Sequence, residues 1–338
     1  MRLQLSLIRR ALGITLGLGG ALLLSGCLAF APGPKDTPRP AVRPQMPIYV
    51  PSVAAQELTK YYADLQRDLL ARGLLRTDGG GPETPYDAED LAERFEILAF
   101  YDEYASGTDA GTAALGRWQQ PVRLVPVFGP SVSAAQAAKD RASLTAYAAR
   151  LQRITGHPVS VAERGNFTVI FAGVDDADFV ENKVRRLLPN LSDSDLGLFA
   201  TPPRQFYCLV IAGGPQGDPL NYSRGVALIR SEQSDLMRES CIHEEIAQGL
   251  GLRNDSPRAR PSIFNDDDEF AYLTDHDEKL LQMLYDPRLR IGMGPDEARP
   301  LLRQIARDVM GEVVLSQEPY SSSMGENPHA EGVLDASF

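Results

Sequence analysis

Residues 241–255 constrain the fold more than any other segment. They combine apolar residues at helical spacing with a stop signal, a residue that is expected to end the helix. Ile246, Ala247 and Leu250 are spaced as on one face of a helix. Gly251 follows where a left-handed C-terminal cap is expected. The spacing therefore predicts a helix over this stretch, with its apolar face turned to the core.

The same helix carries polar residues that are candidates for chemistry. Glu244 and Gln248 are four residues apart, so their side chains stack on one face. Glu245 lies about 60° from Gln248 around the axis, at roughly 100° per residue. Asn254 and Asp255 follow beyond the stop signal. Carboxylate and amide groups arranged in this way are candidate catalytic or metal-binding residues.

In this register the stretch resembles the metzincin helix His-Glu-x-x-His-x-x-Gly-x-x-His of zinc peptidases. Glu244 and Gln248 stand where that family has its first two histidines, and Asn254 stands for the third. Glu245 matches the catalytic glutamate, and Gly251 matches the glycine of the turn. The frame of the motif is thus retained while its histidine ligands are replaced.

Two downstream segments extend the resemblance. The Ser-Ile-Phe sequence at 262–264 is similar to the methionine turn of metzincins, and 273–285 is similar to their closing helix. The resemblance implies an α+β (mixed α/β) zincin-like fold: a twisted mixed sheet, a backing helix, a central helix of the active-site type and C-terminal helices. The chain is also similar to uncharacterised bacterial lipoproteins that carry a domain of unknown function.

The ligand chemistry separates two hypotheses for function. Zinc sites use His, Cys or carboxylate ligands, whereas Gln248 and Asn254 offer neutral amide oxygens, which suit a hard ion better. The first hypothesis is a binding module without enzymatic activity or cofactor, whose cleft holds an envelope protein or peptide. The second is a peptidase-like hydrolase with Glu245 as general base. In that case Glu244, Gln248 and Asn254 (or Asp255 in its place) would hold a divalent metal or a water molecule.

The four histidines offer few other ligands. His243, beside two glutamates, could act as a general base or as a ligand outside this register, but a hydrogen bond to backbone or carboxylate is the favoured interpretation. His276 is expected to be exposed in the first turn of the closing helix. His157 precedes a proline in a turn and His329 lies in the tail, so neither is a predicted ligand.

The acidic clusters of the sequence lack the geometry of two known kinds of site. Glu244 and Glu245 diverge by about 100° on a helix, which argues against a pair of glycosidase acids facing each other across a cleft. The Asp-Asp-Asp-Glu run at 266–269 lacks the spacing of an EF-hand. It is predicted to be a solvated charged loop rather than a calcium site.

Residues 1–26 are predicted to be a lipoprotein signal peptide, outside the fold. Three arginines precede the apolar run 11–24, which is short for a membrane span. The segment ends in a Leu-Ser-Gly-Cys sequence that resembles the lipobox, which implies a lipid anchor on Cys27. With Leu28 next rather than Asp, the resemblance implies the periplasmic face of the outer membrane. An ordinary secretory signal or an anchor helix remains the alternative.

Two cysteines remain besides Cys27. Cys208 lies in a strand-like run and Cys241 begins the central stretch. In an oxidising compartment a disulfide between them is expected, and two buried free thiols are the alternative. A catalytic Cys241 is disfavoured, because its only near histidine, His243, lies on a different face.

The composition divides the chain into five segments. After the signal peptide, 27–51 is a linker, and seven prolines within 31–51 make it semi-rigid. An N-terminal helical region is predicted for 52–118 and a zincin-like domain for 119–312. The polar, acidic segment 313–338 is predicted to be a disordered tail.

Hydrophobic periodicity predicts alternating strands and helices within the domain, as expected for a mixed sheet with helices against it. Pro126 argues for an edge strand or a strand end in the first strand. The predicted strands cover 122–128, 159–161, 166–172, 206–212 and 225–230, and the predicted helices cover 58–73, 87–104, 131–155, 175–188 and a last one from Gly294.

The net charge of the chain limits the kinds of molecule that it is expected to bind. The chain has a formal net charge of −11, and loss of the arginine-bearing signal peptide makes it more acidic still. No basic stripe is present along the sequence. The predicted partners are therefore the membrane, through the lipid, and an envelope protein or peptide, but not nucleic acid.

Overall fold

The computed structural model describes residues 49–101, 114–265 and 267–312. The predicted signal peptide with Cys27, most of the predicted linker, the predicted tail with its histidine, and Asp266 lie outside the described residues. The described residues form a mixed α/β fold with a five-stranded mixed sheet and eight α-helices, which confirms the predicted fold class at this level. None of the helices in these ranges is long and apolar enough to span a bilayer.

The sheet is mostly parallel, with one antiparallel edge. Its strands run in the order β3 (Val159–Val161), β2 (Val122–Phe128), β4 (Phe167–Ala172), β7 (Arg224–Arg230) and β5 (Cys208–Gly213). The first four are parallel, and β5 pairs with β7 in the antiparallel direction. Every residue of β4 is buried, as expected for a continuous apolar run in a strand covered on both faces.

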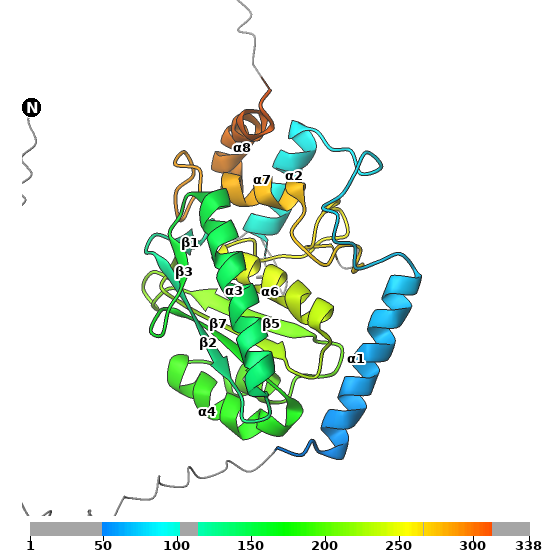
Figure 1. The fold of residues 1–338 in the computed structure, drawn as a ribbon. Coiled ribbons are helices and arrows are strands. Elements are labelled where there is room, and N and C mark those ends of the chain that lie inside the picture. Colours follow the sequence, from blue (N-terminus) through cyan, green and yellow to red (C-terminus); the bar gives the residue numbers. More distant parts are fainter. Residues whose placement is uncertain (1–48, 102–113, 266, 313–338) are drawn as a thin grey trace, which may run out of the picture. The chain divides into compact units, whose positions relative to one another are not determined.

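Helices cover both faces of this sheet (Figure 1). α3 (Ala134–Thr155) and α6 (Asp235–Leu250) share a core with one face. The 3-10 turn η2 (Val174–Asp176) leads into α4 (Ala177–Leu187), and α4 and α5 (Asp193–Ala200) share a separate core with the other face. Alternate side chains of β4 enter the two cores, because successive residues of a strand point to opposite faces.

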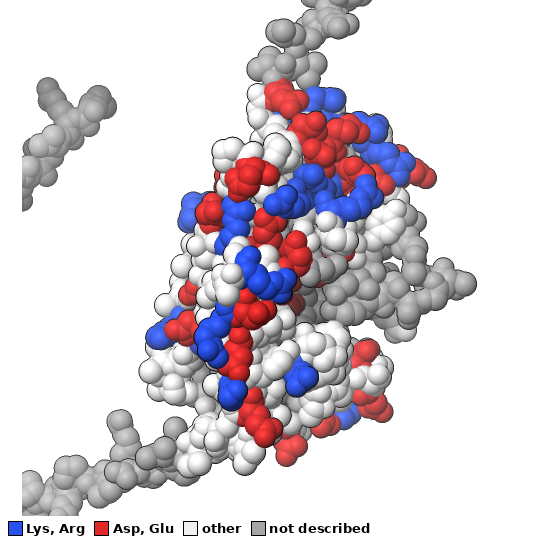
Figure 2. Space-filling model, turned by 90° about the vertical axis from the view of Figure 1, so that its right-hand side faces the viewer, with Lys and Arg blue, Asp and Glu red and all other residues white. Residues whose placement is uncertain are grey.

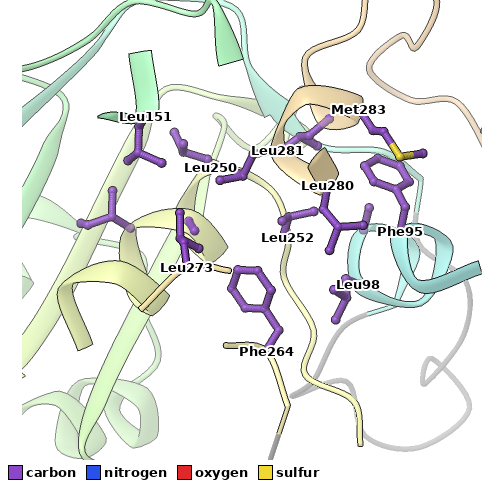
Figure 3. Close-up of a cluster of buried hydrophobic side chains, with 14 of the residues drawn as sticks. Phe95, Leu98, Leu151, Leu250, Leu252, Phe264, Leu273, Leu280, Leu281 and Met283 are labelled. Atoms are coloured by element: carbon purple, nitrogen blue, oxygen red, sulfur yellow. The ribbon is translucent and has the colours of Figure 1, made fainter. Parts of the chain in front are cut away.

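Three further helices extend the larger core beyond the sheet. α2 (Ala88–Phe100), α7 (Asp275–Leu284) and α8 (Pro295–Met310) pack against one another, and α7 also contacts α3. Figure 3 shows side chains of α2, α7, α3 and α6 converging with those of the segment between α6 and α7. The labelled members of this cluster are Phe95, Leu98, Leu151, Leu250, Leu252, Phe264, Leu273, Leu280, Leu281 and Met283. α2 therefore shares one core with helices from the far end of the chain.

The first helix, α1 (Val53–Ala71), packs through a third apolar cluster. Tyr62 and Leu69 are buried there together with Met237 of α6. The Tyr62 hydroxyl also donates a hydrogen bond to Arg204 O at 2.9 Å. These contacts hold α1 against the N-terminal half of α6 and against the segment before β5.

Short elements escaped prediction from the sequence. β1 (Arg117–Trp118) and β6 (Asn221–Tyr222) form a parallel pair of two-residue strands. Such pairs are too short to show an alternating pattern, and α5, with 8 residues, is barely two turns long. Tertiary contacts rather than local periodicity define these elements.

The central helix begins earlier than predicted and ends at the glycine predicted to stop it, so residues 251–255 of the stretch lie beyond it. α6 starts after Ser234 rather than at Cys241, because buried residues such as Met237 continue its inner face toward the N-terminus. It ends at Leu250, because Gly251 adopts a φ of 138°, a conformation that other residues rarely adopt.

Pro126 lies in an inner strand, where the sequence predicted an edge strand or a strand end. β3 pairs only with residues Val122–Leu124 of β2, whereas β4 pairs as far as Phe128. Among the described strands, β2 therefore has a neighbour on only one side at Pro126. A proline, which lacks the N–H donor, is compatible with such a one-sided position.

Candidate functional site

Helix α6 carries the predicted catalytic side chains and lies against the sheet. It packs on β5 and β7, the last two strands on this side. Glu245 and Gln248 are 5% and 8% exposed, whereas Glu244 is partly exposed. The two residues that match the general base and the second ligand of the resemblance are therefore largely removed from water.

The two predicted amide ligands act as hydrogen-bond donors. Gln248 Nε2 donates to Asp255 Oδ1 at 2.9 Å. Asn254 Nδ2 donates to Ile97 O at 3.1 Å, and the backbone N–H of Asn254 donates to Leu98 O at 3.2 Å. Asn254 thus fastens the segment after α6 to α2. Within the described ranges, no group of three or more His, Cys, Asp or Glu side chains is arranged to hold a metal ion.

His243 lies between two tyrosine rings. Tyr147 stacks on its imidazole at 4.2 Å, and Tyr272 lies tilted at 4.7 Å, both measured between ring centroids. Its Nδ1 accepts a hydrogen bond from the backbone N–H of Leu273 at 3.1 Å, so this nitrogen carries no proton. Burial, assisted by the charge of Arg150, lowers the pKa of His243 to about 3. The neutral imidazole joins α6 to the segment that precedes α7.

Acidification is expected to destabilise the fold through this imidazole. The unfolded histidine takes up its proton near pH 6.5, whereas folded His243 resists protonation down to about pH 3. Its contribution to stability is therefore complete above pH 6.5 and is lost progressively as the pH falls through that window. We expect a loss of up to about 1.4 kcal/mol per pH unit from this group, measured by urea unfolding between pH 7 and pH 5.

His243→Gln is the variant that isolates this contribution, because its amide oxygen can still accept the backbone hydrogen bond. The variant should show a shallower dependence of unfolding free energy on pH than the wild type. Other groups that titrate in this range contribute equally to both proteins. Parallel pH profiles for the two proteins would refute a role for His243.

Asp277 holds the loop that resembles the methionine turn. Its Oδ1 accepts from Ser262 Oγ at 2.5 Å, and its Oδ2 accepts from the backbone N–H of Ile263 at 3.0 Å and of Thr274 at 2.9 Å. The carboxylate is fully buried, as is Phe264 of the loop. Three protein donors thus replace water around a buried charge. The result is a rigid connection between this loop and the start of α7.

His276 is completely buried, so the predicted exposure of this residue is wrong. Its ring lies edge-on to Tyr86, with 4.8 Å between the ring centroids. The first turn of α7 packs against the segment that leads into α2, and this long-range contact removes the side chain from water. Burial lowers the pKa of His276.

The acidic loop is more structured than the solvated loop predicted for it. Glu269 is 8% exposed and forms ion pairs with Arg260 at 2.6 Å and with Arg76 at 3.2 Å. The hydrogen bonds from Arg260 are the main reason that the pKa of Glu269 is lowered. Burial raises the pKa of the neighbouring Asp268. Arginines from two other segments therefore hold this loop against the fold.

Cys208 and Cys241 form the predicted disulfide, with 5.9 Å between their Cα atoms. Cys208 is the first residue of β5, and Cys241 lies in α6. The bridge therefore fixes the edge strand to the central helix.

A cavity of about 550 Å³ runs along this edge strand. Residues 209–213 of β5 form one wall, residues of α5 form another, and Gln248 and Gly249 contribute from the end of α6. Arg253, from the segment after α6, completes that side. Of these lining residues, the sequence predicts only Gln248 as a site residue. The others could not be predicted, because the cavity is assembled from segments far apart in the chain.

The outer side of β5 faces this cavity. Among the described strands, only β7 is hydrogen-bonded to β5, which ends the sheet. The outward N–H and C=O groups of an edge strand can pair with an additional strand. The site thus combines a template for main-chain hydrogen bonds with a pocket for side chains.

Comparison with curated proteins and with solved structures gave no match. A family model described as "Protein of unknown function (DUF2927)" matches residues 88–304. The matched region begins with α2, includes the whole sheet and α6, and ends within α8. The predicted link to a family with a domain of unknown function is confirmed to this extent, and the chain belongs to the DUF2927 family.

Proposed function

We propose that this protein is a binding module of the cell envelope, which holds an extended peptide segment of a partner along β5. The observation that carries this proposal is the coincidence of an edge strand with a cavity of about 550 Å³. An extended peptide gains affinity from main-chain hydrogen bonds to a sheet edge and specificity from adjoining pockets. The 6 residues of β5 extend over about 20 Å at about 3.3 Å per residue.

A zincin-like arrangement is part of the proposal. Three features support it: α3 backs the sheet, α6 follows β7 and lies on the sheet, and the 262–264 loop and α7 come next in the chain. The segments that resemble the metzincin helix, the methionine turn and the closing helix follow one another in this order. On this basis the cleft beside α6 is the expected place for a polypeptide ligand.

The side chains in the ligand positions do not fit a zinc ion. Glu244, Gln248 and Asn254 stand in these positions, and the last two use their amide nitrogens as hydrogen-bond donors. A zinc site requires deprotonated or neutral electron-pair donors such as Cys, His or carboxylate. This chemistry supports a binding role rather than zinc-dependent hydrolysis.

We further propose that the domain is anchored by a lipid on Cys27 at the periplasmic face of the outer membrane. The lipobox-like sequence before Cys27 supports this location. The surface charges support a protein partner rather than a nucleic acid. Figure 2 shows Lys and Arg side chains interspersed with Asp and Glu, so the face in view has no extended basic patch.

Filling the cavity is expected to weaken peptide binding by about tenfold or more, which corresponds to about 1.4 kcal/mol. Ala212 of β5 is partly exposed and lines the cavity, so Ala212→Trp places an uncharged bulk where the peptide would lie. Heptapeptides would be selected from a random display library on the purified full chain. Fluorescence anisotropy would then compare their affinities for the wild type and the variant.

The matched control is Ala146→Trp, the same substitution at an exposed position of α3, which should leave affinity unchanged. Failure to select any peptide, or equal affinities for the wild type and Ala212→Trp, would refute the proposal. Cleavage of selected peptides by a protein that retains a stoichiometric metal would instead favour the hydrolase hypothesis, with Glu245 as general base.

A further inference from the structure

Arg253 occupies the α6 side of the cavity. It comes two residues after the cap residue Gly251 and lines the cavity together with Gln248 and Gly249. Val210 of β5 lines the same cavity and packs on the core that β5 shares with α6. A ligand along β5 would therefore pass Arg253 on this side.

The charge of Arg253 is not neutralised by a carboxylate of the described chain. Its Nη2 donates to the carbonyl oxygens of Ala99 and Ala114, both at the long distance of 3.3 Å. Its Nε is buried without a hydrogen-bond acceptor among the described residues. A guanidinium carries five N–H donors, and two long bonds to neutral carbonyls leave donors and charge unmatched within the part of the chain that the structure describes.

Other arginines near α2, unlike Arg253, form ion pairs with carboxylates. Arg258, Arg299 and Arg303 are each paired with a glutamate of α2. At the upper end of Figure 2, where α2 and α8 lie, basic and acidic side chains accordingly alternate. Unlike these three, Arg253 lines the cavity and forms no ion pair with a carboxylate of the described residues.

The remainder of the cavity wall is mostly apolar. Of the described residues that line it, only Asp195 and Arg253 are charged, and Asp195 is exposed and accepts a hydrogen bond from Ser192 Oγ. The apolar side chains of the wall are Leu198, Phe199, Leu209, Val210, Ile211, Ala212, Pro219 and Leu220. The cavity therefore offers apolar surface beside a single cation.

We infer that the segment bound along β5 presents a carboxylate to Arg253. This inference rests on the proposed function and specifies its ligand: an extended peptide with an acidic side chain or a terminal carboxylate between apolar residues. Arginine binds carboxylates through two parallel, charge-assisted hydrogen bonds. Because side chains alternate along a strand, the acidic residue faces Arg253 while its neighbours point to the opposite side, toward α5.

A synthetic array of random heptapeptides tests this inference on the purified full chain. The array carries each sequence with a free and with an amidated C-terminus and is probed with wild type, R253Q, R253K and R258Q. The wild type should retain peptides enriched in Asp or Glu at one position, or peptides with a free C-terminus. R253Q should lose that enrichment, R253K should keep part of it, and R258Q, which removes a charge outside the cavity, should keep all of it.

Individual peptides then give the magnitude. Replacing the selected Asp or Glu by its amide, or amidating the terminus, should weaken binding to the wild type by about tenfold or more. The same change should have no effect on R253Q, and a urea-unfolding midpoint close to that of the wild type would demonstrate that R253Q retains its fold. Peptides bound without any acidic or terminal preference would overturn the inference alone. No bound peptide with any of the four proteins would overturn the proposed function as well.

Discussion

Replacing Cys208 and Cys241 together by alanine is expected to lower the free energy of unfolding by about 3 kcal/mol. The two residues are 33 positions apart, and the bridge removes the open conformations of that loop from the unfolded chain. The bridge also joins β5 to α6, so its loss removes a covalent link between the edge strand and the central helix. Equilibrium urea unfolding of the purified full chain at pH 7 measures the change.

Chemical reduction provides the internal control for this prediction. A reductant should lower the stability of the wild type to that of the double variant and should leave the double variant unchanged. An unfolding midpoint of the double variant equal to that of the oxidised wild type would show that the bridge does not stabilise the fold.

Asp277→Ala is expected to cost at least about 3 kcal/mol, because three buried donors lose their acceptor at about 1 to 3 kcal/mol each. These donors are the Ser262 hydroxyl and the backbone N–H groups of Ile263 and Thr274. The substitution also removes the capping box with which Thr274 and Asp277 begin α7. Thermal and urea unfolding would measure the loss against the wild type.

The neighbouring acid gives a matched control. Asp275 lies in the same first turn of α7 but is exposed, so Asp275→Ala should cost less than about 1 kcal/mol. Asp277→Asn, which retains acceptor oxygen, should fall between the two alanine variants. Similar losses for Asp275→Ala and Asp277→Ala would contradict the role of the buried hydrogen bonds.

These two variants and those of the cavity address different parts of the molecule. Neither the disulfide nor Asp277 lines the cavity, whereas Ala212 and Arg253 do. The first pair should therefore act mainly on stability, and the second mainly on affinity. Measuring the free energy of unfolding and the peptide affinity of every variant would distinguish residues that stabilise α6 from residues that contact a ligand.

Local patterns in the sequence are sufficient to predict the helices and strands whose stability depends on residues close to one another in the chain. The stripe of Ile246, Ala247 and Leu250 with Gly251 after it predicts α6 and its end, because one helical turn brings these residues together. The apolar run of β4 predicts a strand buried on both faces. The Cys208–Cys241 bridge was predictable as well, because the lipobox-like position of Cys27 leaves only these two cysteines.

The environment of single side chains depends instead on segments that are distant in the chain. His276 is buried because the segment before α2 packs over it, and Glu269 is held by arginines from two other segments. That Arg253 has no carboxylate partner among the described residues likewise has no local signal, since it depends on which residues fold around the end of α6. Periodicity and capping are local properties that a sequence contains. Burial, charge pairing and the cavity beside β5 arise only when the sheet and its helices assemble.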